Sequence, residues 1–157
     1  MAVVAVLLTV FFSVFPAISF SQDTIVWKQP FKEVAADGSF RLWLDCEQCY
    51  QEEVNGLPVY RTSLPTALAV ESSYISAAKF RLLAADELAA LNVAVGSLTP
   101  GMPEVRFQNY TYNGEIFTRF EFVPLRITTE GNVEKIVSYT LGIQFSDGSD
   151  AKSAEIQ

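Results

Sequence analysis

The chain has 157 residues, which is long enough for one domain with its own hydrophobic core. Its formal net charge of −7 argues against nucleic acid and anionic membrane surfaces as partners, because both carry negative charge themselves. Histidine is absent, which excludes histidine-based catalysis, Cys–His and Ser–His dyads and most zinc sites. We therefore predict no catalytic residue, no cofactor and no metal site in this chain.

The N-terminal run predicts export. Residues 1–20 contain no charged side chain, and Pro16, Ser19 and Ser21 follow the most apolar part of the run. This pattern is typical of a secretory signal peptide, which we assign to residues 1–21. A retained transmembrane helix is the alternative, because the run is long enough to span a bilayer. After cleavage we expect no membrane insertion of the mature chain, which starts at Gln22.

Two short strands are predicted early in the mature chain. Thr24–Phe31 is rich in residues that favour strands and stops at Pro30, and Phe40–Asp45 alternates apolar and polar side chains. Trp43 falls on the polar side of the second strand. We therefore expect Trp43 to be partly exposed or to lie at an interface.

Proline limits the position of the next segment. Pro58 and Pro65 bracket an extended piece that we assign to a sheet edge or a loop, because proline has no N–H group to donate. Leu68–Leu83 then predicts one long strand with a kink near Ser76–Ala77, since its apolar residues follow no single parity.

A short helix or turn is predicted from Asp86 to Asn92, with Asp86 as an N-cap or a first-turn acid. Adjacent acids such as Asp86–Glu87 and Glu52–Glu53 point in different directions. We therefore interpret them as solvated side chains, not as an acid–base pair.

The segment Glu104–Phe145 predicts three consecutive antiparallel strands. Asn113–Gly114 suits a two-residue type I′ hairpin, because both central residues of that turn need positive φ. This hairpin pairs the region of Phe107 with that of Phe120. The apolar parity then switches at Pro124, which we interpret as a bulge or an edge position.

The last predicted strand alternates from Val133 to Phe145, with Lys135 and Ile136 as the only breaks. We assign the following apolar side chains to one face of this strand: Val133, Val137, Tyr139, Leu141, Ile143 and Phe145.

Strands and turns account for most of the mature region, which predicts an all-β fold class. We expect an antiparallel β-sandwich-like domain over residues 22–145 with one short helix at most, because a single sheet would leave its aromatic face in water. The polar segment 146–157 has the composition of a linker, and we expect it to be truncated before a further domain.

Cys46 and Cys49 have the spacing of a dithiol redox site. That chemistry needs a stabilised thiolate, whereas here the pair follows a strand and is flanked by Asp45 and Glu47, which raise a thiol pKa. We therefore favour a structural disulfide that closes a tight loop in an oxidising compartment. Thiol oxidoreductase activity is the alternative.

Aromatic side chains form the second candidate site. Trp43, Tyr110 and Tyr112 are candidates for a surface that binds a sugar, a peptide or a protein partner. Packing within the sheet and the core is the alternative, because strands of all-β domains are rich in aromatic residues for that reason.

Three groups of short motifs carry a family resemblance. They are Gly56–Tyr60 (GLPVY) with Leu64–Pro65, Phe80–Leu83 (FRLL) with Asp86–Leu88, and Phe122–Arg126 (FVPLR) with Val133–Leu141 (VEKIVSYTL). Through these motifs, roughly residues 25–145 resemble the N-terminal domain of the PorU family. The members of this family are the sortases of the type IX secretion system of Bacteroidetes. The Cys46 and Cys49 pair departs from the usual pattern of that family.

The resemblance implies a gingipain-type cysteine peptidase that removes C-terminal signals from secreted cargo and attaches the cargo to the cell surface. In that family a Cys–His pair in a downstream caspase-like domain is catalytic, so no catalytic residue transfers to this chain. The resemblance therefore implies a non-catalytic accessory domain in the periplasm or at the outer-membrane cell surface. Its partners would be the peptidase domain of the same protein and other surface-attachment components.

A rival hypothesis comes from a different class of protein. The chain could be a self-contained secreted β module that binds a glycan or a peptide through Trp43, Tyr110 and Tyr112.

Overall fold

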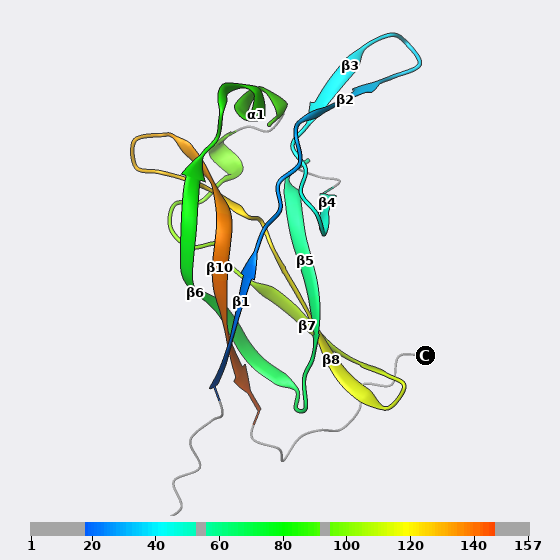
Figure 1. Cartoon of the computed structure of the whole chain (residues 1–157), viewed down its shortest axis with the longest axis vertical. Helices are drawn as coiled ribbons and strands as arrows, with labels where there is room; N and C mark the ends of the chain where they lie inside the picture. The colour runs from blue at the N-terminus through cyan, green and yellow to red at the C-terminus, as the bar shows by residue number, and fades with distance from the viewer. Residues whose placement is uncertain (1–17, 53–55, 92–94, 147–157) are drawn as a thin grey trace, which may run out of the picture.

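The computed structural model describes residues 18–52, 56–91 and 95–146, which form an antiparallel β fold (Figure 1). The predicted all-β, sandwich-like domain with one short helix is confirmed. The elements in chain order are β1 (Ile18–Thr24), β2 (Phe31–Val34), β3 (Phe40–Trp43), β4 (Cys49–Gln51), β5 (Pro58–Pro65), β6 (Val70–Leu82), α1 (Ala85–Ala90), a 3-10 turn (Val95–Ser97), β7 (Arg106–Tyr112), β8 (Glu115–Phe122), β9 (Leu125–Ile127) and β10 (Val133–Phe145). Among the described residues, no helix has the length and apolar character needed to cross a membrane.

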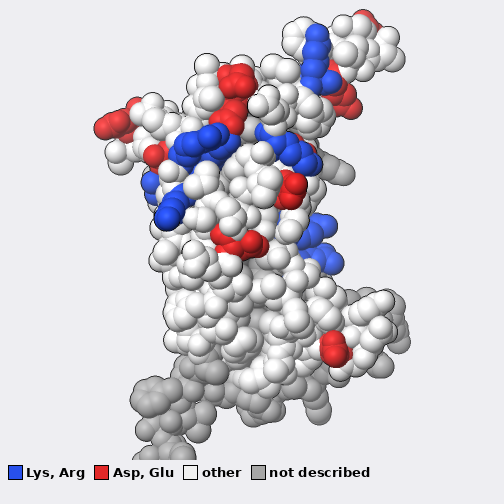
Figure 2. Space-filling view, in the orientation of Figure 1, with Lys and Arg blue, Asp and Glu red and all other residues white. Residues whose placement is uncertain are grey.

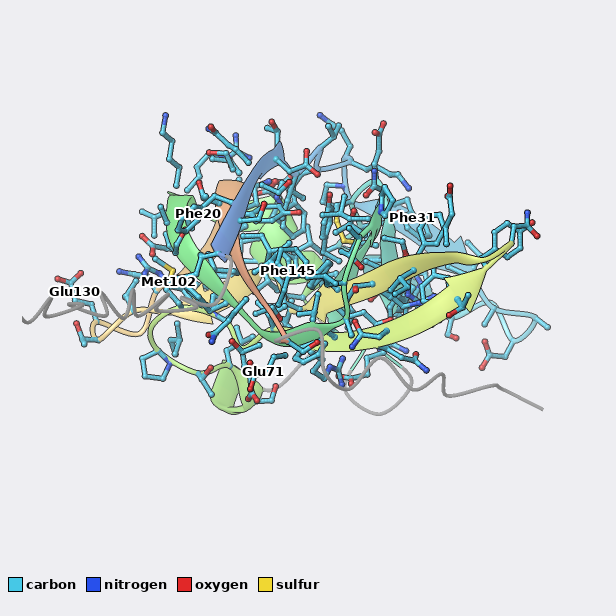
Figure 3. The ribbon with its side chains drawn as sticks, turned by 90° about the horizontal axis from the view of Figure 1, so that it is seen from below. Phe20, Phe31, Glu71, Met102, Glu130 and Phe145 are labelled. Atoms are coloured by element: carbon cyan, nitrogen blue, oxygen red, sulfur yellow. A yellow bond between two sulfur atoms is a disulfide. The ribbon has the colours of Figure 1, made fainter. Side chains whose placement is uncertain are left out.

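Two sheets and a separate hairpin organise these strands. The β10 sheet has the order β1-β10-β6, and β9 pairs with the first residues of β10. The β8 sheet has the order β4-β5-β8-β7, and β2 and β3 form a two-stranded hairpin of their own. Viewed along the long axis, the two sheets form two layers with side chains packed between them (Figure 3).

The core between the sheets is centred on three aromatic rings. The ring centroids of Tyr60 and Phe122 are 5.4 Å apart, and those of Phe122 and Tyr139 are 5.1 Å apart in an edge-to-face contact. Such geometry is favourable because the positive edge of one ring meets the negative face of the other. Buried apolar residues complete this cluster: Ile25, Val70, Ile75, Val105, Phe120, Ile136, Leu141 and Ile143.

The hairpin at Asn113–Gly114 is confirmed. Both residues have positive φ, 51° and 82°, as a type I′ turn requires. The turn sets the register of β7 against β8, so that Phe107 lies opposite Phe120 as predicted.

Pro124 marks the point where the chain leaves one sheet for the other. β8 ends at Phe122 in the β8 sheet, and β9 begins at Leu125 and pairs with β10. Proline cannot donate to a ladder, but its carbonyl accepts a hydrogen bond from the Ile136 N–H at 3.0 Å. The predicted parity switch at Pro124 is therefore confirmed, but the predicted bulge or edge position is wrong, because Pro124 lies in a crossover between the layers. The segment Glu104–Phe145 accordingly forms four strands and not the predicted three.

The predicted face of β10 is wrong in its first half. A bulge at Val137 separates Ile136 from Ser138 in the pairing with β6. One extra residue reverses the alternation, so Ile136 faces the core with Tyr139. Val133 instead joins a second apolar cluster that includes Ala90, the last residue of α1, and Leu91 after it.

The segment Pro58–Pro65 is not at a sheet edge, because it forms β5 between β4 and β8. The two prolines stand at the ends of the strand, where Pro58 faces the last residue of β4 and Pro65 faces Phe117. A missing N–H group at either end interrupts no ladder. The edge restriction on proline therefore does not apply to the strand between them.

The predicted continuous strand Thr24–Phe31 is also wrong. β1 ends at Thr24, and the next backbone N–H groups bond to different elements: Ile25 to Val137 and Lys28 to Asp45. The segment therefore crosses from the β10 sheet to the loop that holds the cysteines, and β2 begins only at Phe31.

The irregularity predicted in the long strand β6 is confirmed. The pairing with β10 passes from Ile75 to Ala77, which leaves Ser76 out of the register. Asp86 lies in the first turn of α1, as predicted, and Asn92 lies outside the described residues.

β1 contains the last residues of the predicted signal peptide. Ile18–Ser21 pair with β10, and residues 1–17 lie outside the described residues. Asp23 accepts a hydrogen bond from the Tyr60 hydroxyl at 3.0 Å. Burial raises the pKa of Tyr60 to about 12, so the phenol remains a donor at neutral pH. Cleavage after Ser21 would leave this hydrogen bond in place.

Asn109 on β7 joins the two sheets through its side chain. Its Oδ1 accepts a hydrogen bond from the Val70 N–H and its Nδ2 donates one to the Val70 carbonyl, both at 3.0 Å. Thr118 donates to the same Oδ1 at 2.8 Å and lies 3.0 Å from the Thr66 hydroxyl. The amide thus acts as a neighbouring strand would for the first residue of β6.

We predict that Asn109→Ala lowers the free energy of unfolding by about 1–3 kcal/mol, because it leaves both backbone groups of buried Val70 without these partners. Urea unfolding measures the change. Gln108→Ala, on the same strand but exposed, is the control and should alter stability by less than about 0.5 kcal/mol. Equal losses in the two variants would contradict a role of Asn109 in joining the sheets.

Candidate functional site

Cys46 and Cys49 are joined by a disulfide that closes a tight turn before β4. Between them, Gln48 has a φ of 62°, and the Cys49 N–H donates to the Cys46 carbonyl at 3.2 Å. Cys46 is fully buried in the main core cluster and forms a backbone bridge with Trp27. Neither cysteine begins a helix, so this geometry lacks the dipole that stabilises a reactive thiolate.

Trp43 lies half-buried on β3, with both its ring and its N–H group engaged. Its Nε1 donates to Glu33 at 2.6 Å, and the Arg41 guanidinium lies 3.9 Å from the ring centroid. Both partners belong to the same hairpin. These contacts stabilise the hairpin and cover part of the ring.

Tyr110 and Tyr112 lie at the other end of the molecule, near the tip of the β7–β8 hairpin (Figure 1). Tyr110 is half-buried and stacks on Phe117 at 5.7 Å, whereas Tyr112 is 64% exposed. The structure therefore brings the two tyrosines together but does not bring Trp43 to them.

The β2–β3 hairpin projects from the body of the domain (Figure 1). Phe31, Val34 and Phe40 are all exposed on it, the last two by 60% or more. An isolated two-stranded hairpin is marginally stable in water, and exposed apolar side chains on it are typical of a surface that a partner covers. This hairpin is the first candidate docking surface.

The outer face of the β10 sheet is the second candidate surface. Phe20, Gly142 and Tyr74 lie side by side across three strands, and the Tyr74 ring covers the space a side chain at Gly142 would need. Phe20, on β1, lies on the outer side of the layers (Figure 3). Figure 2 shows charged groups gathered in the upper half of this face, while its lower half is almost free of them.

A buried ion pair, which sequence reasoning missed, joins α1 to β10. Lys135 Nζ donates to Glu87 Oε1, and their side chains are 1% and 8% exposed. Arg81 Nη2 lies 3.2 Å from the same oxygen, and the Ala84 N–H donates to Oε2 at 2.9 Å. Lys135 Nζ also lies 4.9 Å from the centre of the Trp27 ring. The buried charges thus have several partners, as burial requires.

The interpretation of Glu87 as a solvated acid is wrong. Burial raises the pKa of this carboxyl, but the hydrogen bonds from Lys135 and Ala84 and the charges of Lys135 and Arg81 outweigh it, so the net pKa is lowered. Two sequence signals indicate the pair: Lys135 interrupts an apolar alternation, and Glu87 stands three residues after the N-cap of a helix, where it can accept the N-cap N–H.

The described residues hold no group of three or more side chains suited to bind a metal ion. The outer face of the β8 sheet contains a hollow, and three arginines contribute to its lining: Arg61, Arg106 and Arg119.

Searches with the sequence match no family model and no curated protein. Comparison with solved structures shows that the fold is similar to that of chains from structures of peptidases. The particular neighbours come from structures of the gingipains RgpB and K of Porphyromonas gingivalis. The complex of RgpB pro- and mature domains matches with a TM-score of 0.53 and 10% identity, over 87% of this chain and 84% of that chain. A structure of gingipain K, solved to explain its zymogenic latency, matches with a TM-score of 0.54 and 6% identity, over 87% of this chain and 96% of that chain. At these identities the likeness shows a shared fold.

We predict that Lys135→Met lowers the free energy of unfolding by about 3–5 kcal/mol, because it leaves the Glu87 carboxylate buried without its main partner. Urea unfolding measures the change. The double variant Lys135→Met/Glu87→Leu should recover most of the loss, because no unpaired charge remains. Lys28→Met, which breaks the more exposed pair with Asp45, is the control and should cost less than about 1 kcal/mol.

The same pair predicts a pH dependence. Because the pKa of Glu87 is lowered in the folded state, its contribution to stability is present above the pKa of a free glutamate and is lost as the pH falls through the folded value. Urea midpoints of the wild type should therefore decrease below about pH 4, and the double variant should show a smaller decrease. Identical pH profiles of the two proteins would contradict this assignment.

Proposed function

We propose that this chain is a non-catalytic accessory domain that packs against a gingipain-type peptidase domain. The observation that carries the proposal is a fold likeness that extends over most of this chain and most of two gingipain pro-domain chains. One of those neighbours is a complex of pro- and mature domains, so in that protein the fold is in contact with a peptidase.

The more specific proposal is that the peptidase is a type IX secretion sortase. The support is the resemblance of the motifs around Gly56–Tyr60, Phe80–Leu83 and Phe122–Leu141 to the N-terminal domain of the PorU family. In this proposal the domain supports removal of C-terminal signals from secreted cargo and attachment of the cargo at the cell surface. The chemistry takes place in the peptidase domain, which supplies the Cys–His pair.

The projecting hairpin is the part of the domain that we assign to docking. It has little support from the two sheets, and it exposes three apolar side chains at 47–64%. Covering them removes apolar area from water, which is the main favourable term in protein association. A partner surface would also supply the packing that a lone hairpin lacks.

Two rival functions lead to different results in the same experiments. A self-contained glycan- or peptide-binding module would depend on Tyr110 and Tyr112, at the end of the molecule opposite the hairpin. A thiol oxidoreductase would depend on Cys46 and Cys49, but the burial of Cys46 restricts attack on that sulfur.

A binding experiment tests the proposal. The full chain is titrated with the gingipain-type peptidase domain encoded in the same genome, and we expect a saturable one-to-one complex by calorimetry. Val34→Lys/Phe40→Lys should weaken the affinity at least ~10-fold, because it places two charges in an apolar contact. Circular dichroism should show both proteins folded, since the two side chains are exposed.

Tyr112→Lys is the matched control, because Tyr112 is as exposed as Val34 but lies at the far end of the domain. It should leave the affinity for the peptidase unchanged. Loss of binding with Tyr112→Lys but not with the hairpin variant would overturn docking through the hairpin. Disulfide reduction of insulin by the isolated chain would favour the oxidoreductase. Peptidase rates with and without the domain show whether the chain also confers latency.

A further inference from the structure

The hollow on the outer face of the β8 sheet has a volume of about 460 Å³ and collects side chains from three adjacent strands. Arg61 on β5 and Arg106 on β7 both lie opposite Glu121 on β8. One step along the same face, Ser63 and Gln108 lie opposite Arg119. The sheet register therefore places Arg119 diagonally beside both other arginines.

The acids nearby do not balance these three cations. Arg61 Nε lies 2.7 Å from Glu121 Oε1, which is a good ion pair. Arg106 Nη1 lies 3.7 Å from Glu52 Oε1, which is longer than a hydrogen bond. Arg119 Nε is buried and, among the described residues, has no hydrogen-bond partner.

An unsatisfied buried donor on a cation is costly, and like charges at diagonal positions of a sheet repel each other. An anion in the hollow would relieve the repulsion, because it would lie between the three guanidinium groups that line it. The whole protein has a net charge of −7, so the positive charge at this hollow is a local feature of the surface.

The charge of the site fits one carboxylate. The charged side chains that line the hollow, three arginines and Glu121, carry +2, and Glu52, which lies outside the lining beside Arg106, reduces the local net charge to +1. A single carboxylate neutralises that charge, whereas a phosphate with two charges leaves an excess. The planar fork of a guanidinium also matches a carboxylate with two parallel hydrogen bonds.

The neighbouring strand favours a peptide as the source of the carboxylate. β7 is the last strand of its sheet, and in the described part of the chain no strand pairs with its outer edge. A peptide added along β7 would direct every second side chain to the outer face, next to Arg106 and Gln108. The stacked rings of Tyr110 and Phe117 continue the same face beyond the arginines.

We propose that this hollow binds a carboxylate side chain of an acidic peptide segment, which pairs along β7. The hollow belongs to the β8 sheet and not to the projecting hairpin, so the proposal does not depend on docking to a peptidase. The protein, although acidic overall, would thus recognise an acidic partner through a positively charged site.

A titration followed by NMR tests the site. The ¹⁵N-labelled full chain is titrated with a capped peptide that contains two aspartates, Ac-Ala-Asp-Gly-Asp-Ala-NH₂, and with the same peptide carrying asparagines. We expect saturable shifts of the Arg119 Nε–Hε signal and of β7 amides with the aspartate peptide only. Arg119→Gln should weaken binding at least ~10-fold, because it removes one of the three positive charges that line the hollow.

Arg41→Gln is the control, because it removes the same charge from the distant β2–β3 hairpin. It should change the affinity by less than about twofold, since that charge is screened in physiological salt. Arg106→Gln, on a more exposed side chain, serves as a second test if Arg119→Gln does not fold. Equal effects of the Arg119 and Arg41 variants would overturn the site. Binding of digalacturonate more strongly than the aspartate peptide would overturn the peptide as the ligand and assign the hollow to an acidic glycan. Binding of inorganic phosphate more strongly than the peptide would overturn the assignment of the hollow to a carboxylate.

Discussion

The pairing of β10 along both of its edges is the constraint on which the rest of the fold depends. β6 follows one edge over nearly the whole strand, while β9 and β1 occupy successive parts of the other edge. A strand paired on both sides has its backbone groups satisfied within the sheet, so it can be buried. Two apolar clusters then form against it, one with Tyr139 towards the β8 sheet and one with Val133 towards α1.

The two sheets remain in contact because the chain and several side chains cross between them. Pro124 lies where the chain passes from one sheet to the other. The side-chain amide of Asn109 hydrogen-bonds the backbone N–H and carbonyl groups of Val70 on the facing sheet. The Lys135–Glu87 pair connects α1 to the central strand in a similar way. These polar contacts are few, so the apolar core contributes most of the stability and the polar contacts select one arrangement of the layers.

The elements that could be predicted from sequence are those set by local chemistry. Asn113–Gly114 defines its turn because few residues tolerate positive φ, and Pro124 interrupts a ladder wherever it stands. The bulge at Val137 could not be predicted, because it results from fitting β10 to a partner that lies far away in the chain. Pro58–Pro65 was misplaced for a related reason, since the position of a strand in its sheet depends on its neighbours.

The sites were harder to predict than the strands because they combine distant residues. Glu87 and Lys135 are 48 positions apart, and the three arginines come from β5, β7 and β8. Trp43, Tyr110 and Tyr112 were grouped by residue type alone, and the order of strands separates the first from the other two. Fold class depends on patterns within segments, whereas a site depends on the arrangement of segments relative to each other.

The isolation of the β2–β3 hairpin has a consequence for the dynamics of the domain. Its ladder contains four residue pairs, and contacts within the hairpin include Lys32 over Phe40 and Glu33 with Trp43. Leu42 connects its base to the second apolar cluster. Opening of such a unit leaves the sandwich intact, so its amide protons exchange with solvent through local fluctuations and not through global unfolding. The domain therefore combines a slowly exchanging body with a fast-exchanging arm, and protection of that arm reports directly on whether it is covered.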